Sequence, residues 1–179
     1  SLMPYYSVSG SNYARIIYDK LYARLAYVQA DGTCQPRAAE RWESADDGYS
    51  IVFFLNQKAA FHDGTPVTAQ HWVDTITRVL VHDGARPFLS GEVVDRCLAG
   101  ALETGAAVAG EKLGVEAVDE YTLKLTFTSP TLPEEFLVDK NRDIYVLPTH
   151  LLQDIPPEEL MTDDFWLAPV GSGPCQYVS

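Results

Sequence analysis

The chain has 179 residues, of which 46% are hydrophobic and 21% charged, a composition typical of one folded domain rather than of a disordered segment. Its 25 Asp and Glu against 13 Lys and Arg give a formal charge of -12, and no stretch gathers Lys or Arg into a patch. Because nucleic acids and anionic membrane surfaces attract such patches, the composition argues against both partners. No run approaches the roughly 20 apolar residues of a membrane span.

The first predicted elements are a helix and a β-hairpin. Apolar residues recur at helical spacing over residues 11–27, and a turn at Ala30-Asp31-Gly32 ends this helix. Residues 37–44 and 49–56 then flank Asp46-Asp47-Gly48. The Asp-Gly pair favours the left-handed conformations of a tight turn, so these two runs are predicted to form a hairpin.

A loop and two helices are predicted over the next segment. Residues 61–66, with the sequence FHDGTP, form a loop by composition, and Thr68 caps a helix that runs to about Val81. The apolar pattern then weakens. A further helix is predicted around residues 91–102, with a loop at residues 105–110.

The last third of the chain predicts a second hairpin and several short elements. Residues 113–118 and 122–128 flank Asp119-Glu120, and the second run alternates apolar and polar side chains. The remaining predictions are a short helix at 132–140, a strand at 144–147, a helix that opens after Pro148, a loop at 155–164 and the start of a strand at 176–179. Without a repeat or a linker, these elements predict one mixed α+β unit over residues 1–179.

The cysteines could suggest disulfides or a metal site, and the histidines could suggest a metal site, but a structural role explains both sets of residues more simply. Three widely spaced cysteines, Cys34, Cys97 and Cys175, cannot form a fully paired disulfide framework or a CxxC metal knuckle, so we interpret them as packing residues. His62 and His71 lie close in sequence but not one helical turn apart, as metal ligands in HExxH are. We therefore interpret this region as a turn leading into the helix cap, without a metal.

A nucleophilic triad could be assembled on paper from Ser172, His150 and an aspartate. The GxSxG elbow is absent, however, because Ser172 lies in G-S-G-P, and Pro174 would disrupt the helix that follows a nucleophile. We expect Gly171 and Gly173 instead to supply backbone conformations that other residues tolerate poorly.

The order of motifs resembles the family-5 extracellular solute-binding proteins, the periplasmic oligopeptide, dipeptide and nickel binders of ABC importers. Six segments carry the resemblance: IIYDKLY (16–22), QADGTCQPRAAERWESADDGYSIVFFL (29–55), AAFHDGTPVTAQHWV (59–73), LGVEAVDEYTLKLTFTSP (113–130), IYVLPTHLL (144–152) and PVGSGPCQYV (169–178). Their order and approximate spacing match the family's, which makes the set more specific than any one segment.

The resemblance implies a periplasmic-binding-protein-like fold in which two lobes close on a ligand. Residues 1–179 would form the N-terminal portion of lobe I, truncated before the second lobe. The implied function is to capture a peptide or a related small solute, nickel chelates included, and to present it to the importer's membrane permease. The implied protein is a monomer without enzymatic activity, cofactor or metal, located in the periplasm or outside the cell, with a lipid anchor as an alternative.

Two segments are predicted to contact the ligand. Tyr5, Tyr6 and Ser9 precede the first helix, in a segment that borders the cleft in the family that this chain resembles, and they could supply apolar faces and hydroxyl donors. Asn141 and Arg142 precede the predicted strand at 144–147, where the guanidinium could bind a ligand carboxylate.

Two other functions stay open at this point. The region of His62 and His71 could belong to a small hydrolase or a metal-dependent enzyme, and the acidic surface could belong to a protein-interaction module that docks on a basic partner. An activity screen separates the first from a binding protein, and a salt-dependent pull-down separates the second.

Overall fold

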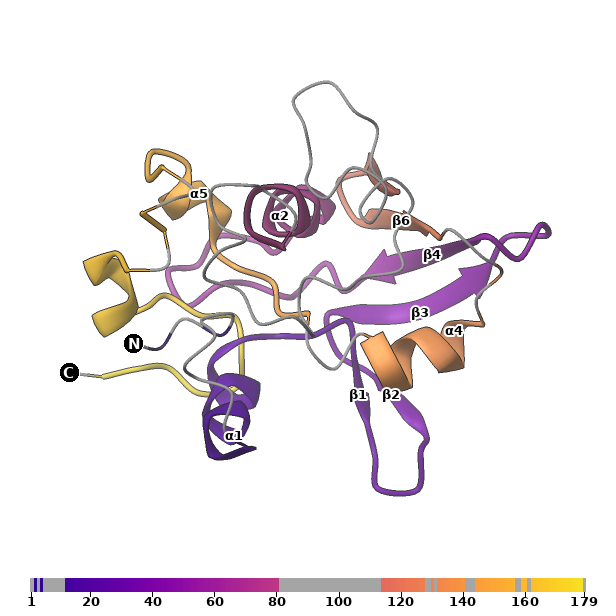
Figure 1. Cartoon of the computed structure of the whole chain (residues 1–179), viewed down its shortest axis with the longest axis horizontal. Helices are drawn as coiled ribbons and strands as arrows, with labels where there is room; N and C mark the ends of the chain where they lie inside the picture. Colours follow the sequence, from indigo (N-terminus) through magenta and orange to yellow (C-terminus); the bar gives the residue numbers. More distant parts are fainter. Residues whose placement is uncertain are drawn as a thin grey trace.

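The computed structural model describes residues 2, 4, 12–80, 114–127, 130, 132–140, 144–156, 159–160 and 162–178. These residues combine a four-stranded antiparallel sheet, a two-stranded hairpin and short helices (Figure 1). The predicted α+β class is therefore confirmed. The helix and loop predicted at 91–102 and 105–110 lie outside the described residues. Within the described part of the chain, no helix is long and apolar enough to cross a bilayer.

The elements in chain order are α1 (Asn12–Leu21), β1 (Ala26–Val28), β2 (Cys34–Pro36), β3 (Ala39–Ser44), β4 (Ser50–Leu55), α2 (Ala69–Asp74), β5 (Val115–Asp119), β6 (Thr122–Thr126), α4 (Pro133–Glu135) and α5 (Thr149–Leu152). Two π-helical segments, η2 (Thr75–Leu80) and η4 (Phe136–Lys140), continue α2 and α4, and a 3-10 turn, η6 (Asp164–Leu167), follows α5. Both predicted hairpins, β3–β4 and β5–β6, are confirmed. So are the Thr68 cap and the helix after Pro148.

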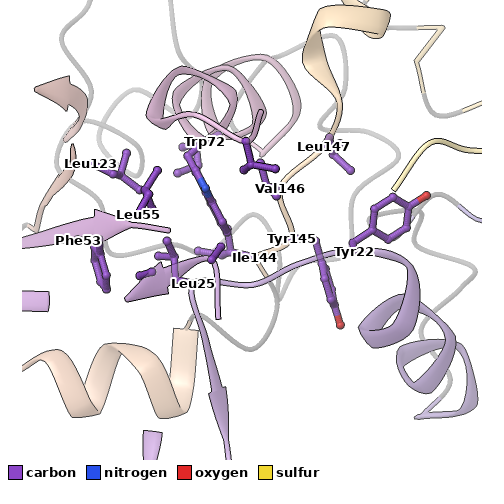
Figure 2. Packing of buried hydrophobic residues seen from close by; sticks show 14 of the residues in the cluster. Tyr22, Leu25, Phe53, Leu55, Trp72, Leu123, Ile144, Tyr145, Val146 and Leu147 are labelled. Carbon is purple, nitrogen blue, oxygen red and sulfur yellow. The ribbon is translucent and has the colours of Figure 1, made fainter. Parts of the chain in front are cut away.

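The larger sheet has the strand order β3-β4-β6-β5, and one of its faces supplies much of the core. Phe53 on β4 lies opposite Leu123 on β6, and directly opposite residues of an antiparallel pair share a face. Both side chains are fully buried. Phe53 also packs against Phe136 of η4, with ring centroids 5.8 Å apart. Figure 2 shows Leu123 and Leu55 gathered beside Trp72 of α2, which covers the same core.

The first helix is shorter than the sequence predicts. α1 ends at Leu21, and residues 26–28 form β1, which pairs with β2 across a turn containing Gly32 at φ +84°. The helical spacing seemed to continue because Leu25 and Ala26 are core residues, 1% and 0% exposed. Burial of these side chains, and not helix, accounts for the pattern. The turn itself is confirmed, but the β1–β2 hairpin around it was missed.

Two predicted strands are wrong. Residues 144–147 are buried but irregular, and residues 176–178 are irregular as well. The Val146 amide donates to the Ala23 carbonyl at 3.0 Å, and the Leu147 amide donates to the Thr75 hydroxyl at 3.1 Å. The partners of these two amides thus lie on the segment after α1 and on η2, and not on a neighbouring strand. A short apolar run indicates burial without settling which backbone partner it meets.

The segment 171–173, which we name the GSG crossing, runs across the C-terminal end of α1. The amides of Ser172 and Gly173 both donate to the Leu21 carbonyl, at 2.9 and 2.8 Å. The Ser172 hydroxyl accepts a hydrogen bond from the Ala23 amide at 3.0 Å. The last carbonyls of a helix have no partner within the helix, so the crossing acts as the cap of α1.

Close approach, and not backbone conformation, explains the two glycines of the crossing. Neither has a positive φ, so the expectation of unusual conformations is wrong. A Cβ atom on Gly171 would overlap the Leu21 carbonyl oxygen, and one on Gly173 would overlap the Lys20 carbonyl oxygen. Only glycine lets the backbone lie this close to the helix end.

Gly171→Ala should lower the free energy of unfolding by about 1–3 kcal/mol, because the added methyl pushes the crossing away from α1. Urea denaturation of the chain measures this. Ser172→Ala is the matched control: it adds no atom and removes one hydrogen bond, so it should cost about 1 kcal/mol. A Gly171→Ala variant as stable as wild type would contradict the steric explanation.

Adjacent residues on opposite faces of β4 test the sheet packing. Phe53→Ala should cost about 3–5 kcal/mol, because the ring is fully buried. Phe54 is half-buried on the other face, with the Arg41 guanidinium 3.4 Å from its ring centroid. Phe54→Ala should therefore cost only about 1 kcal/mol. Equal losses in urea denaturation would mean that the assigned faces are wrong.

Candidate functional site

The five residues predicted to contact ligand, Tyr5, Tyr6, Ser9, Asn141 and Arg142, lie outside the described residues. Their roles therefore stay predictions. Described residues close to each of the two segments nevertheless meet at one place, the C-terminal end of α1.

Contacts at this end of α1 come from three parts of the chain. The Tyr22 hydroxyl donates to the Leu2 carbonyl at 3.1 Å, and the Leu2 amide donates to the Trp166 carbonyl at 3.1 Å. The Tyr145 ring packs edge-on against Tyr22 and Tyr18, with centroids 6.4 and 6.3 Å apart. Figure 2 shows Tyr22 and Tyr145 side by side next to α1. A described residue close to each predicted ligand segment, Leu2 for one and Tyr145 for the other, thus contacts the same helix end.

A cleft of about 450 Å³ opens here, between α1, the β1–β2 hairpin and the GSG crossing. We name it the α1 cleft. Its volume falls within the range of small-molecule sites. Three basic side chains, Lys20, Arg24 and Arg37, line it against one acidic side chain, Asp19. The cleft is therefore locally positive on a chain whose formal charge is -12.

Two of the basic side chains differ in how they are held. Arg24 forms a salt bridge with Asp19 at 2.7 Å, and its side chain is only 11% exposed. Its guanidinium lies 5.5 Å from the Tyr145 ring centroid, and the Tyr145 hydroxyl donates to Asp19 at 2.8 Å. Arg37 is exposed and lies over the Tyr27 ring at 5.7 Å. Guanidinium groups bind carboxylates, so this arrangement is suited to binding an anionic group.

A second polar group lies at the start of α2, where four side chains form a continuous hydrogen-bond chain. Asp63 contacts Nε2 of His150 at 2.8 Å, and Nδ1 of His150 contacts Nε2 of His71 at 3.2 Å. Nδ1 of His71 lies 2.9 Å from the Thr68 hydroxyl and 3.2 Å from the Thr68 amide. His71 is thus the third helical residue of a capping box whose N-cap is Thr68.

The environment shifts two pKa values in this chain of side chains. Burial, and then the neighbouring His150, lower the pKa of His71, and the carboxylates of Asp74 and Asp63 oppose this shift. Burial raises the pKa of Asp63, but hydrogen bonds from His150 and Thr65 outweigh that effect and lower it overall. Neutral His71 and ionised Asp63 are therefore the favoured forms.

The histidine region corresponds to neither the metal site nor the triad considered from the sequence. In the described residues, no three His, Cys, Asp or Glu side chains are grouped to hold a metal ion. His62 lies apart from His71, with its ring nitrogens on the Gly171 amide at 3.2 Å and the Gly173 carbonyl at 2.9 Å. Both ring nitrogens of His150 contact Asp63 and His71, while the Ser172 hydroxyl accepts from an amide. The predicted turn at Asp63-Gly64 is confirmed, with Gly64 at φ +91°.

The two cysteines among the described residues differ in burial. Cys34 is half-buried and packs against the core, as predicted, whereas Cys175 is exposed and the packing interpretation is wrong for it. Cys97 lies outside the described residues.

Sequence reasoning missed the α1 cleft because it extended the first helix to residue 27. Arg24 precedes β1 and Arg37 follows β2. Their side chains therefore line the same cleft only because the two strands pair. The available signal for that hairpin was the Asp31-Gly32 pair, which favours a tight turn between two strands.

Comparison with known proteins identifies the family to which this chain belongs. Residues 33–179 match the family model described as bacterial extracellular solute-binding proteins, family 5 Middle. The chain is 35% identical over 121 residues to the probable deoxycholate-binding periplasmic protein YgiS of Escherichia coli, covering 65% of this chain and 22% of that protein. It is 33% identical over 116 residues to the periplasmic oligopeptide-binding protein OppA of Escherichia coli, covering 62% and 20%. The chain thus spans about a fifth of these relatives.

Solved structures agree along nearly the whole chain. The crystal structure of Haemophilus influenzae OppA in complex with the peptide RPPGFSPFR superposes with a TM-score of 0.77 at 26% identity, covering 97% of this chain and 32% of that one. The murein tripeptide binding protein MppA of Escherichia coli gives a TM-score of 0.75 at 27% identity, covering 97% and 32%. The family model covers most of the chain and the fold agrees, so the chain belongs to the family 5 bacterial extracellular solute-binding proteins.

Proposed function

We propose that this chain is part of the ligand-binding component of an ABC importer, which captures peptides or a related small solute outside the cytoplasmic membrane. The observation that carries this proposal is the agreement in fold, over 97% of the chain, with an oligopeptide-binding protein in complex with a peptide. The protein binds and releases its ligand without changing it. The relatives with printed locations are periplasmic, which supports a periplasmic or extracellular location here too.

The ligand class follows from what the relatives' ligands have in common. Oligopeptides, a murein tripeptide and deoxycholate differ in shape, but each carries a carboxylate. A guanidinium is the side chain best suited to bind that group, which supports the predicted role of Arg142. We infer a peptide as the ligand, because peptide binders predominate among the similar proteins.

The chain would supply one side of the binding site. Since it covers only 20–32% of the relatives described above, we infer that residues 1–179 form the N-terminal portion of lobe I and that a second lobe closes over the ligand. Closure by hinge motion would then present the loaded form to the membrane permease.

The full-length protein should bind short peptides with micromolar or tighter affinity, whereas residues 1–179 alone should bind them weakly or not at all, because half of the burying surface is missing. Isothermal titration calorimetry with a defined mixture of tripeptides measures both. Micromolar binding by residues 1–179 alone would contradict the inferred division into lobes.

Arg142→Ala in the full-length protein should weaken peptide binding roughly tenfold or more, because a hydrogen-bonded charge pair is lost. Arg41→Ala is the matched control: Arg41 is exposed on β3, where it pairs with Glu43, and its loss should leave affinity unchanged. Peptides with an amidated C-terminus should bind the wild type and Arg142→Ala about equally. Unchanged affinity of Arg142→Ala for free-acid peptides would remove Arg142 from the site.

A further inference from the structure

The Thr68 amide fixes the direction of each hydrogen bond in the series of side chains that runs from Thr68 to Asp63. A backbone N–H can only donate, so Nδ1 of His71 accepts from the Thr68 amide. The proton of a neutral His71 then lies on Nε2 and donates to Nδ1 of His150. The proton of His150 consequently lies on its Nε2 and donates to the Asp63 carboxylate. Each assignment follows from the previous one and starts from a neutral His71, the form that its lowered pKa favours.

A proton added to either ring leaves two donors facing each other. On His71 it would occupy Nδ1, opposite the Thr68 amide. On His150 it would occupy Nδ1, opposite the Nε2 proton of His71. The Thr68 hydroxyl, 2.9 Å from Nδ1 of His71, could accept the added proton there, but the Thr68 amide would then lose its acceptor. Protonation of either ring therefore breaks one of the bonds.

We propose that Asp63, His150, His71 and Thr68 form an acid-sensitive latch that holds the 61–66 turn and α5 on α2 only while the His71 imidazole is neutral. The latch joins segments far apart in sequence, since 79 positions separate His71 from His150 and 87 separate Asp63 from His150. The Phe61 ring packs against both imidazoles, with centroids 4.9 and 5.2 Å away. This apolar wall shields the contact between the two imidazoles.

The charged groups near the latch come from each element that packs on it. The turn contributes Asp63, and α2 contributes Asp74, which accepts a hydrogen bond from Thr149 of α5 at 3.4 Å. The turn between β5 and β6 contributes Glu120, whose main-chain carbonyl accepts the Ala69 amide at 2.8 Å. The carboxylates of Asp74 and Asp63 favour a charged His71, but its pKa is still lowered, because burial and His150 outweigh them.

The sign of the pH effect follows from this lowered pKa. An unfolded chain takes up a proton on histidine as the pH falls through about 6.5, whereas the folded chain resists it at His71. The folded state therefore loses stability below that pH. Above it, the ring is neutral in both states and contributes no pH dependence.

Opening of the latch would reach the α1 cleft through His62, the residue beside Asp63. The His62 amide donates to the Gly171 carbonyl at 2.8 Å, and its ring contacts both glycines of the GSG crossing. Through His62, the 61–66 turn therefore supports the crossing in addition to the crossing's own bonds to the Leu21 carbonyl. If the protein binds ligand as proposed above, ligand would be held less tightly at acidic pH, a consequence that rests on the proposed function.

His71→Gln tests the latch, because an amide side chain can accept from Thr68 and donate to His150 but cannot take up a proton. Urea denaturation of the chain without ligand, at pH 7.5 and pH 5.5, gives the folding equilibrium constant. Between these pH values the constant should fall roughly tenfold further in wild type than in His71→Gln. His71→Met, which offers neither bond, should be less stable than His71→Gln at both pH values.

Equal pH dependence of wild type and His71→Gln would overturn the latch. Should His71→Gln fail to fold, nitrogen-15 NMR of the wild-type rings at pH 8 decides, since the latch requires a proton on Nε2 and none on Nδ1 at both His71 and His150. A rise in Tm with one equivalent of zinc would also overturn it, because the two rings would then be metal ligands. These measurements use no peptide, so their failure leaves the proposed function untouched, and a failed peptide titration leaves the latch untouched.

Discussion

The arrangement of this chain depends on the contact between the GSG crossing and the end of α1. Two amides of the crossing donate hydrogen bonds to the Leu21 carbonyl. This contact ends α1 at a defined residue and ties the last part of the chain to the first. Closing so long a loop costs chain entropy, and a single hydrogen bond contributes only about 1 kcal/mol. The crossing therefore combines several bonds, and two glycines let its backbone lie against the helix end.

From this crossing, a series of side-chain contacts continues to the start of α2. His62 holds the crossing, and Asp63 beside it contacts His150 of α5. His150 in turn contacts His71, which belongs to the capping box of α2. One turn of six residues thus carries both attachments, and its shape is set locally by Gly64 and by the Asp63 carboxylate, which accepts the Thr65 amide at 2.9 Å. A change at the α2 cap can therefore reach α1 through few intermediates.

The features predicted correctly from the sequence are those that depend on neighbouring residues. Gly48 lies at φ +71° in the β3–β4 turn, as an Asp-Gly pair predicts, and Thr68 caps α2. The end of α1 could not be predicted, because the donor to Leu21 lies at the opposite end of the sequence. The contact of His150 with His71 could not be predicted for a related reason. Spacing in the sequence suggests which side chains could form a site. The hydrogen-bond partners of the His150 ring nitrogens, however, are residues distant in sequence.

The same distinction bears on what the protein binds. The crossing, the latch and the sheet are contacts within the scaffold, and relatives with oligopeptide and deoxycholate ligands match the same chain. Ligand identity must then be decided by side chains that the scaffold carries but does not use for its own packing. Arg24, held by Asp19 and Tyr145, serves the scaffold, whereas Arg37 is exposed at the α1 cleft. Differences in ligand among such proteins should therefore concentrate in exposed and loop residues, while the residues at the end of α1 remain constrained by the crossing.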